Sequence, residues 1–273
     1  MENALQTAAE WLRSADGLLI TAGAGMGIDS GLPDFRGPGG FWSVYPALGR
    51  ARIDFTEIAN PAAFTQDPRQ AWGFYGHRLD LYRRTEPHAG FHLLRDIGAA
   101  LPQGAFVFTS NVDGQFQKVG FAARQICEIH GSIHHLQCLA GCSNTIWPAR
   151  DFIPVVDSET CRLVNELPHC SKCGSLARPN ILMFGDWNWL EHRTAGQQEA
   201  LQQWLSSVDQ LVCIEIGAGT HIPTVRLFSE RCGGKLIRLN PGEAQTPSGR
   251  EAVSLPFGGL FGLMQLANAL SPM

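Results

Sequence analysis

Four of the eight cysteines in this 273-residue sequence form two close pairs, and thiolates at such spacings are typical metal ligands. Cys138 and Cys142 are separated by three residues, and Cys170 and Cys173 by two. A short turn can aim two thiolates at one ion, and two such turns complete the tetrahedral set that zinc prefers. Because four cysteines leave no open coordination position, the sequence predicts one structural zinc ion rather than a catalytic one.

A glycine-rich turn follows the first apolar run of the chain. Gly23, Ala24 and Gly25 lie within the run TAGAGMG at 21–27. Such a turn lets backbone amides approach a pyrophosphate when it leads from a strand into a helix, which we expect here. The spacing differs from the usual dinucleotide fingerprint, because the third glycine position is Ile28. A turn made only for packing therefore stays open at this point.

Three short polar segments follow, and each contains side chains that could hold a ligand or move a proton. An aromatic ring lies between opposite charges in the first, an amide and a carboxylate lie in the second, and an imidazole lies in the third. These residues are Asp34, Phe35 and Arg36, then Asn111 and Asp113, then His130. An imidazole near its ordinary pKa can accept a proton at neutral pH. Among nine histidines, His130 is the favoured base, because it precedes a Gly-Ser turn that leads to the first cysteine pair.

Together these segments resemble the signature of the sirtuin family, in the family's order and over about 8–266. The likeness is carried by 23–37, 109–114 (TSNVDG), 128–132 (EIHGS), 178–186 (RPNILMFGD), 216–220 (IGAGT), 239–241 (LNP) and the two cysteine pairs. The chain departs from the family pattern at three positions. Gly27 replaces the usual Ser, Ser110 the usual Gln, and Asp186 the more common Glu.

The resemblance implies an enzyme that consumes NAD and transfers the acyl group of a protein lysine to ADP-ribose, with release of nicotinamide. It implies that Asn111 positions the nicotinamide ribose and that Asp113 holds the nicotinamide amide. Phe35 would block the return of nicotinamide, and His130 would take a proton from a ribose hydroxyl. The catalytic residues are then His130 and Asn111, and the further NAD contacts are Gly23, Ala24, Gly25, Asp34, Phe35, Arg36, Asp113, Gly217, Ala218 and Asn240.

A tyrosine and an arginine three residues apart indicate which acyl group the enzyme would prefer. Tyr75 and Arg78 would share one face of a helix. They resemble the Tyr-x-x-Arg pair of sirtuins that prefer succinyl or malonyl lysine, in which the arginine forks to the distal carboxylate. An ordinary amphipathic helix with a surface arginine is the alternative. The resemblance also places the substrate peptide beside Phe184 and Gly185.

Three other readings compete with deacylation. An ADP-ribosyltransferase or NAD hydrolase on the same scaffold would share the cofactor residues but would not need His130 as a base, and Gly27 and Ser110 keep it open. A non-enzymatic NAD-binding or zinc module should not need Asn111, Asp113 and His130 together. A Rossmann-type dehydrogenase is disfavoured by the broken glycine fingerprint.

Short apolar runs alternate with helical stripes and must position these residues. The runs at 18–22, 105–109, 211–216 and 236–239 predict buried strands. The pattern predicts an α/β fold, with a Rossmann-like, doubly wound, mostly parallel sheet and a small zinc-ribbon and helical insertion module. We predict that 1–40, 85–135 and 184–273 form the NAD-binding domain, and that a helical insertion at 41–84 and a zinc-binding module at 136–183 form the small domain.

The composition narrows the class of partner. A net charge of −4 and a pI of about 6.1 give no support for a nucleic-acid partner. The apolar runs are far shorter than a membrane span, and the N-terminal segment lacks the apolar stretch of a signal peptide. We therefore expect an acylated lysine on a protein or peptide as the partner, no membrane, and a cytoplasmic location, where cysteines bind metal or stay free.

Overall fold

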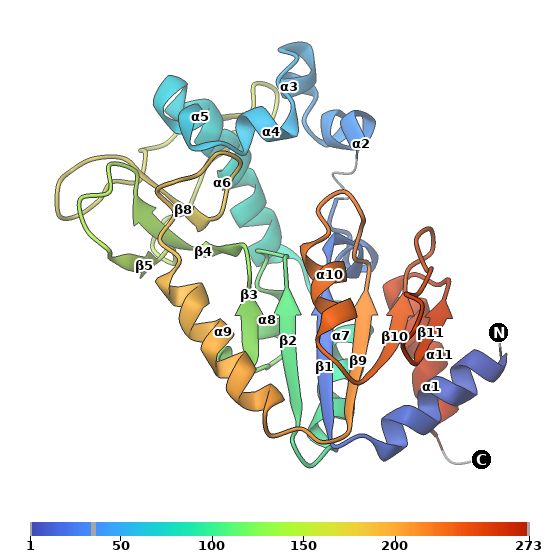
Figure 1. Cartoon of the computed structure of the whole chain (residues 1–273). Helices are drawn as coiled ribbons and strands as arrows, with labels where there is room; N and C mark the ends of the chain where they lie inside the picture. Colours follow the sequence, from blue (N-terminus) through green and yellow to red (C-terminus); the bar gives the residue numbers. More distant parts are fainter. Residues whose placement is uncertain (1, 34–36, 272–273) are drawn as a thin grey trace.

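The computed structural model describes residues 2–33 and 37–271, and its centre is a six-stranded parallel sheet (Figure 1). The strand order is β11-β10-β9-β1-β2-β3, and every neighbouring pair is parallel. The strands are β1 (Gly17–Ala22), β2 (Ala105–Thr109), β3 (Ile126–Glu128), β9 (Leu211–Ile216), β10 (Lys235–Leu239) and β11 (Ala252–Leu255). The order reverses about β1, as in doubly wound folds. The predicted fold class is confirmed.

Helices cover both faces of this sheet. Successive strand residues point to opposite sides, and both sets are apolar and buried, so each face packs against helices. Leu18 and Ile20 of β1 share one apolar cluster with α1, α7, α8 and α11, whereas Leu19 shares another with α9 and α10. The helices are α1 (Glu2–Ser14), α7 (Ala89–Ala99), α8 (Gln115–Lys118), α9 (His192–Leu205), α10 (Thr224–Arg231) and α11 (Gly259–Leu270). We call residues 2–33, 89–130 and 192–271 the sheet lobe.

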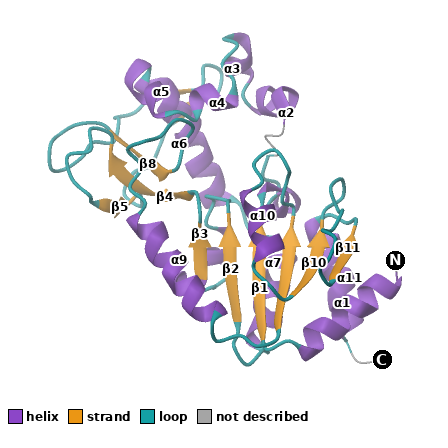
Figure 2. Cartoon of the chain, viewed as in Figure 1, coloured by secondary structure: helices purple, strands orange, loops and turns teal. Residues whose placement is uncertain are grey.

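Residues 37–84 and 131–190 form a second body that we call the small lobe, and 85–88 and 191 connect it to the sheet lobe. Figure 2 shows its helices above a short, separate sheet. Its helices are α2 (Gly37–Val44), α3 (Pro46–Arg50), α4 (Phe55–Ile58), α5 (Pro61–Gln66) and α6 (Pro68–Arg84). Its strands are β4 (Gly131–Cys138), β5 (Ile146–Pro148) and β8 (Ala177–Ile181), in the order β5-β4-β8, and the hairpin β6 (Val156–Asp157) and β7 (Arg162–Leu163).

Helix α6 fixes the geometry of the small lobe. Asp67 caps its first turn by accepting from the amide of Gln70 at 3.1 Å, and Pro68 occupies a position that needs no amide donor. A Cβ on Gly73 would lie 2.0 Å from the carbonyl oxygen of Cys161, so this glycine lets the β6–β7 hairpin reach the helix. The indole of Trp72 donates to Ala177 on β8 at 2.9 Å. The helix is therefore held on two sides.

Strand β4 links the two lobes. It begins directly after His130 and ends at Cys138, and it pairs with β8 at both ends, with a shift of register between Ser132 and Leu136. The predicted boundary between 135 and 136 falls inside this strand, and the division into domains stays a prediction.

Among the described residues, no helix is both long enough and apolar enough to cross a bilayer.

Candidate active site and metal centre

A cleft of about 650 Å³ opens where the carboxyl ends of β1, β2 and β9 face the small lobe. Ligands of open α/β sheets bind at this edge. Predicted site residues from both lobes line it, namely Gly23, Ala24, Tyr75, Arg78, Asn111, Asp113, His130, Phe184 and Ala218. Gly25, Gly185 and Gly217 are chain neighbours of lining residues, and Asn240 lies three residues before the lining residue Glu243, but none of these four lines the cleft itself. The predicted contacts Asp34, Phe35 and Arg36 lie outside the described residues.

The glycine turn after β1 is packed backbone against backbone. The amide of Gly25 donates to Gly217 at 3.1 Å, and a Cβ on Gly25 would lie 2.6 Å from the Cα of Gly217. A Cβ on Gly23 would lie 2.7 Å from the carbonyl oxygen of Gly217. These glycines are thus required by a close approach between the loops after β1 and β9. The approach leaves Ala24 and Ala218 on the cleft wall.

Helical structure does follow the turn, as expected, but it is not an α-helix. Two short 3₁₀ helices follow instead, at Ala24–Met26 and Ile28–Ser30, and Gly31 ends them in the left-handed conformation. Glycine is a poor helix former, and contact with Gly217 fixes the first turn in place. At Gly27, where the family pattern has Ser, an added Cβ would lie 2.8 Å from the end of the Leu32 side chain. Leu32 occupies the space next to this missing side chain.

Asn111 is tied to the glycine turn. Its side-chain amide donates to the carbonyl of Gly23 at 3.0 Å, and its backbone amide donates to the hydroxyl of Thr109 at 3.0 Å. That hydroxyl in turn donates to Ala22 at 2.9 Å. The ends of β1 and β2 therefore hold Asn111 at a fixed place on the cleft wall.

Asp113 lies on the same wall and is buried. Its Oδ1 accepts from the amide of Gln115 at 2.9 Å, at the start of α8. Burial raises the pKa of Asp113 to about 6, and the negative charge of Glu128 adds to the rise, while the Gln115 amide and Arg78 oppose it. Burial makes the ionised form of this carboxyl group unfavourable. A hydrogen bond from a donor such as an amide NH₂ would stabilise that form.

His130 faces the cleft from the junction of β3 and β4. Its carbonyl accepts from Leu182 at 2.9 Å. Gly131 follows it with φ of 79°, and a Cβ there would lie 2.1 Å from the carbonyl of Asn180. Burial lowers the pKa of His130, so its imidazole is neutral at pH 7 and can accept a proton.

The far end of the cleft is formed by α6. Tyr75 and Arg78 are 1% and 8% exposed, so the surface-arginine alternative is excluded. The guanidinium carbon of Arg78 lies 5.2 Å from the ring centroid of Phe74, 5.8 Å from that of Tyr75 and 5.4 Å from that of Tyr82. A cation among aromatic rings is attracted to their faces. This end of the cleft is therefore both apolar and positively charged.

The loop after β8 forms another wall. The amide of Phe184 donates to Ala59 at 2.9 Å, and its ring meets that of Phe55 edge-on at 5.9 Å. Asp186 accepts two hydrogen bonds from Arg178, at 2.6 and 2.9 Å, and both side chains are buried. This bidentate pair holds the loop that carries Phe184.

At the opposite end of the cleft, Asn240 is buried behind the wall. Its side-chain amide donates to Ala218 at 2.9 Å, and its Oδ1 accepts from the amides of Gly242 and Glu243 at 3.0 and 2.9 Å. Asn240 thus shapes the loops that line this end. The hydroxyl of Thr220 donates to Glu243 at 2.6 Å, and both of these residues do line the cleft.

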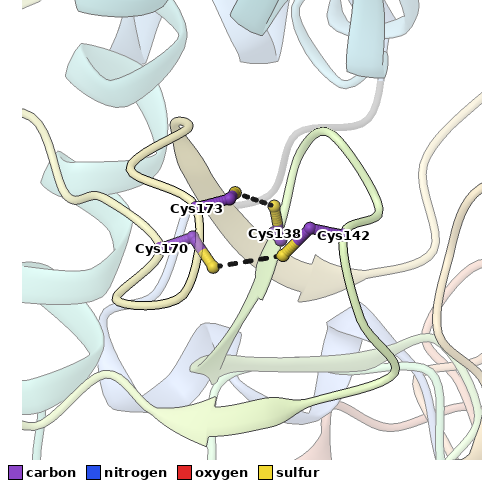
Figure 3. A group of neighbouring side chains, drawn as sticks. All are labelled: Cys138, Cys142, Cys170 and Cys173. Carbon is purple, nitrogen blue, oxygen red and sulfur yellow. Dashed lines mark hydrogen bonds between the residues drawn. The ribbon is translucent and has the colours of Figure 1, made fainter.

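The four paired cysteines meet outside the cleft (Figure 3). All four sulfur atoms lie within 4.8 Å of one another, and the pairs Cys138–Cys173 and Cys142–Cys170 are 3.6 Å apart. A tetrahedral ion with Zn–S bonds of about 2.3 Å holds its sulfurs at about 3.8 Å. The donor set and its spacing fit one structural zinc, as predicted. The imidazole of His169 instead contacts the carbonyl of Gly174 at 2.9 Å.

Several cleft residues were not identified from the sequence. Helical spacing could have found Tyr82, because it lies one turn beyond Arg78. Val112, Met183 and Thr220 lie within the quoted motifs 109–114, 178–186 and 216–220 but were not assigned to the site, and no local pattern marks the loop residues His221 and Glu243.

Comparisons with known proteins agree with this geometry. The Sir2 family model matches residues 23–222. The NAD-dependent protein deacylase of Thermococcus kodakarensis is 32% identical, over 85% of this chain and 83% of that protein. The mitochondrial NAD-dependent protein deacylase sirtuin-5 of Danio rerio is 29% identical, over 83% of this chain and 73% of that protein.

Solved structures share the fold. A Sir2 homologue in complex with NAD is 25% identical, with a TM-score of 0.68, over 99% of this chain and 95% of that chain. A mutant of a Sir2 homologue in complex with ADP-ribose is 24% identical, with a TM-score of 0.70, over 99% of this chain and 96% of that chain.

Proposed function

The chain belongs to the Sir2 family, and from this premise we propose that it is an NAD-dependent lysine deacylase. It transfers the acyl group of a protein or peptide lysine to ADP-ribose and releases nicotinamide. One observation carries the proposal: Asn111, Asp113 and His130 line a single cleft together with the glycine turn. Asn111 and Asp113 come from one segment of the chain, His130 from a second and the glycine turn from a third, and a module that only bound NAD would not need the base.

NAD supplies an activated anomeric carbon, which the acyl oxygen attacks as nicotinamide leaves. Asp113 accepts hydrogen bonds from the nicotinamide amide, and its burial makes that contact favourable. Asn111, fixed by Gly23 and Thr109, orients the adjoining ribose. His130 accepts a proton at its neutral imidazole.

We propose further that the preferred acyl groups are succinyl and malonyl. Arg78 and Tyr75 are buried at the small-lobe end of the cleft, and a buried guanidinium binds a carboxylate more strongly than an exposed one does. In this proposal the substrate lysine lies along the wall that carries Phe184 and Gly185.

The deciding experiment incubates the purified protein with NAD and peptides that carry acetyl-, butyryl-, malonyl- or succinyl-lysine. Mass spectrometry then identifies the nucleotide product. O-acyl-ADP-ribose together with free lysine peptide is the expected result, and His130→Tyr should abolish it. ADP-ribosylated protein, or free ADP-ribose alone, would instead support a transferase or NAD hydrolase.

The acyl preference is tested by Arg78→Met, which should lower the ratio of kcat/KM for succinyl- over butyryl-lysine by about 100-fold. Arg84→Met is the matched control, because this arginine is exposed on the same helix and pairs with Asp80. An unchanged ratio in Arg78→Met would refute the preference while leaving deacylation itself in place.

We also propose that the protein works in a reducing compartment such as the cytoplasm. All eight cysteines are free thiols in the structure, and the four of the metal centre must remain reduced to bind zinc.

A further inference from the structure

All three tyrosines of this chain gather around one arginine. Tyr75, Arg78 and Tyr82 follow one another at i, i+3 and i+7 on helix α6 and line the same end of the cleft. Tyr45 directly follows α2 and is buried near the same guanidinium. The pair recognised in the sequence, Tyr75 and Arg78, is thus part of a larger constellation.

Tyr82 makes the most specific contact with Arg78. Its hydroxyl oxygen accepts from Nε of Arg78 at 3.0 Å and from Nη2 at 2.9 Å. These two nitrogens form one edge of the planar guanidinium, so a single oxygen fixes the rotation of the whole group. Tyr82 is itself held, because it is 5% exposed and its carbonyl accepts from Gln115 at 3.2 Å.

The proton of this hydroxyl points elsewhere. A tyrosine hydroxyl has one proton to donate as well as lone pairs to accept with, and here Arg78 uses the lone pairs. Within 2–33 and 37–271, no acceptor lies against the Tyr82 proton. Burial raises the pKa of Tyr82, so the proton stays on the oxygen at neutral pH. The hydroxyl is therefore a donor on the wall of the cleft, next to a cation.

We propose that Tyr82 is a specificity-determining residue of the acyl pocket. It positions the Arg78 guanidinium and donates its own proton to the terminal carboxylate of a short dicarboxylic acyl group, such as succinyl. Arg78 and Tyr82 then bind the two oxygens of one carboxylate from adjacent turns of α6. The inference rests on the proposed deacylase function and adds a residue that lies outside the Tyr-x-x-Arg pattern.

Tyr45 provides the internal contrast. It is buried near the same guanidinium, but its hydroxyl lies 2.9 Å from Nδ1 of His77, and it does not line the cleft. Removal of this hydroxyl therefore costs a hydrogen bond inside the small lobe without removing a donor from the pocket. Tyr45→Phe and Tyr82→Phe each delete one tyrosine hydroxyl. The hydroxyl of Tyr45 lies behind the cleft wall, whereas Tyr82 lines the cleft.

The test compares succinyl- and butyryl-lysine peptides, whose acyl chains have the same length and differ in a terminal carboxylate or methyl group. Tyr82→Phe should lower the ratio of kcat/KM for succinyl over butyryl by about tenfold, with most of the change in KM. Tyr45→Phe should keep the ratio within about twofold of the wild type. Because both substrates are assayed on one preparation, partial unfolding does not change the ratio.

Two further measurements separate the possible failures. Tyr82→Phe added to Arg78→Met should change the ratio little further, because the carboxylate site is already lost. Binding of the two peptides by calorimetry, without NAD, should show the same shift. An unchanged ratio in Tyr82→Phe, with a lowered one in Arg78→Met, would overturn the role of Tyr82 and leave the deacylase intact. Absence of nicotinamide release from any acyl peptide by the wild type would overturn both.

Discussion

The two lobes of this molecule achieve precise positions in different ways. In the sheet lobe, backbone contacts position the site: parallel strands end at one edge, and the glycine turns after β1 and β9 touch directly. In the small lobe, the site is built from side chains: aromatic rings around α6, a buried Arg178–Asp186 pair and four cysteines hold it. The proposed cofactor end thus rests on main-chain geometry, whereas the proposed acyl end rests on individual residues.

The difference predicts which parts of the molecule tolerate change. A ladder of backbone hydrogen bonds survives most single substitutions, because every residue type supplies the same groups. A metal knuckle or a buried ion pair fails when one member is lost, because its partners are left uncompensated. The small lobe should therefore be the more fragile of the two, and its substrate end the easier to alter.

Removal of zinc should cause the largest loss of stability, and this loss should be confined to the small lobe. Cys173→Ser, or a chelator, removes a contribution of about 10–16 kcal/mol typical of structural zinc sites. We expect amide exchange to become fast over 131–183 while β1 and β9 remain protected. Cys232→Ser, a cysteine of the sheet lobe outside the metal cluster, is the control. Uniform protection in the zinc-free protein would contradict the comparison.

The Arg178–Asp186 pair should rank second. Arg178→Met leaves a buried carboxylate without its partner, which costs about 3–5 kcal/mol of unfolding free energy in denaturant titration. The Arg162–Asp67 pair has similar geometry but is 41% and 38% exposed, so Arg162→Met should cost about 0–1 kcal/mol. Equal losses for the two variants would show that burial does not set the value of these pairs.

The backbone contact of the sheet lobe should rank third. Gly25→Ala forces a Cβ to within 2.6 Å of Gly217, and the main chain on both sides must shift. We expect a loss of about 2 kcal/mol in stability, together with weaker NAD binding. Gly196→Ala is the matched control, because this glycine lies exposed on α9 with open space beside it. That variant should be neutral or up to about 1 kcal/mol more stable.

A change of pH should give the smallest effect, at the point where the lobes share the cleft. Above its pKa of about 6, Asp113 is ionised and accepts from the nicotinamide amide; below it, the acid is protonated. KM for NAD should therefore rise about fivefold as pH falls through 6. Burial lowers the pKa of His130 and so moves its own titration toward lower pH, and Asp113→Asn separates the two groups. A limb that persists in Asp113→Asn would contradict the assignment.

Periodicity in the sequence was sufficient for the elements that are long or fully buried. The strands β1, β2, β9 and β10 stand out as apolar runs, whereas β3 has only three residues and β11 is largely not buried. The pattern of apolar residues cannot reveal such strands, because they become strands only by pairing with a neighbouring strand in the folded sheet. The glycine turn was found, but its 3₁₀ geometry depends on Gly217, almost 200 positions away in the chain.

The candidate site divides in the same way. Cysteine spacing predicted the metal cluster, because ligands in one turn are local in sequence. The role of Tyr82 depends on which atoms of Arg78 its hydroxyl meets, and the burial of Asn240 depends on the loops that close over it. Side-chain direction at this level is a product of packing.

Strand β4 has a practical consequence, because it runs from the residue after His130 to a cysteine of the metal cluster. A zinc ion held by these cysteines would lie outside the cleft, yet the strand would make it a remote anchor for His130, the proposed base. A partly demetallated sample should then be a mixture of fully competent and inert molecules rather than a uniformly slowed population. Specific activity should scale with bound metal per chain, while the Michaelis constant of the surviving fraction stays the same.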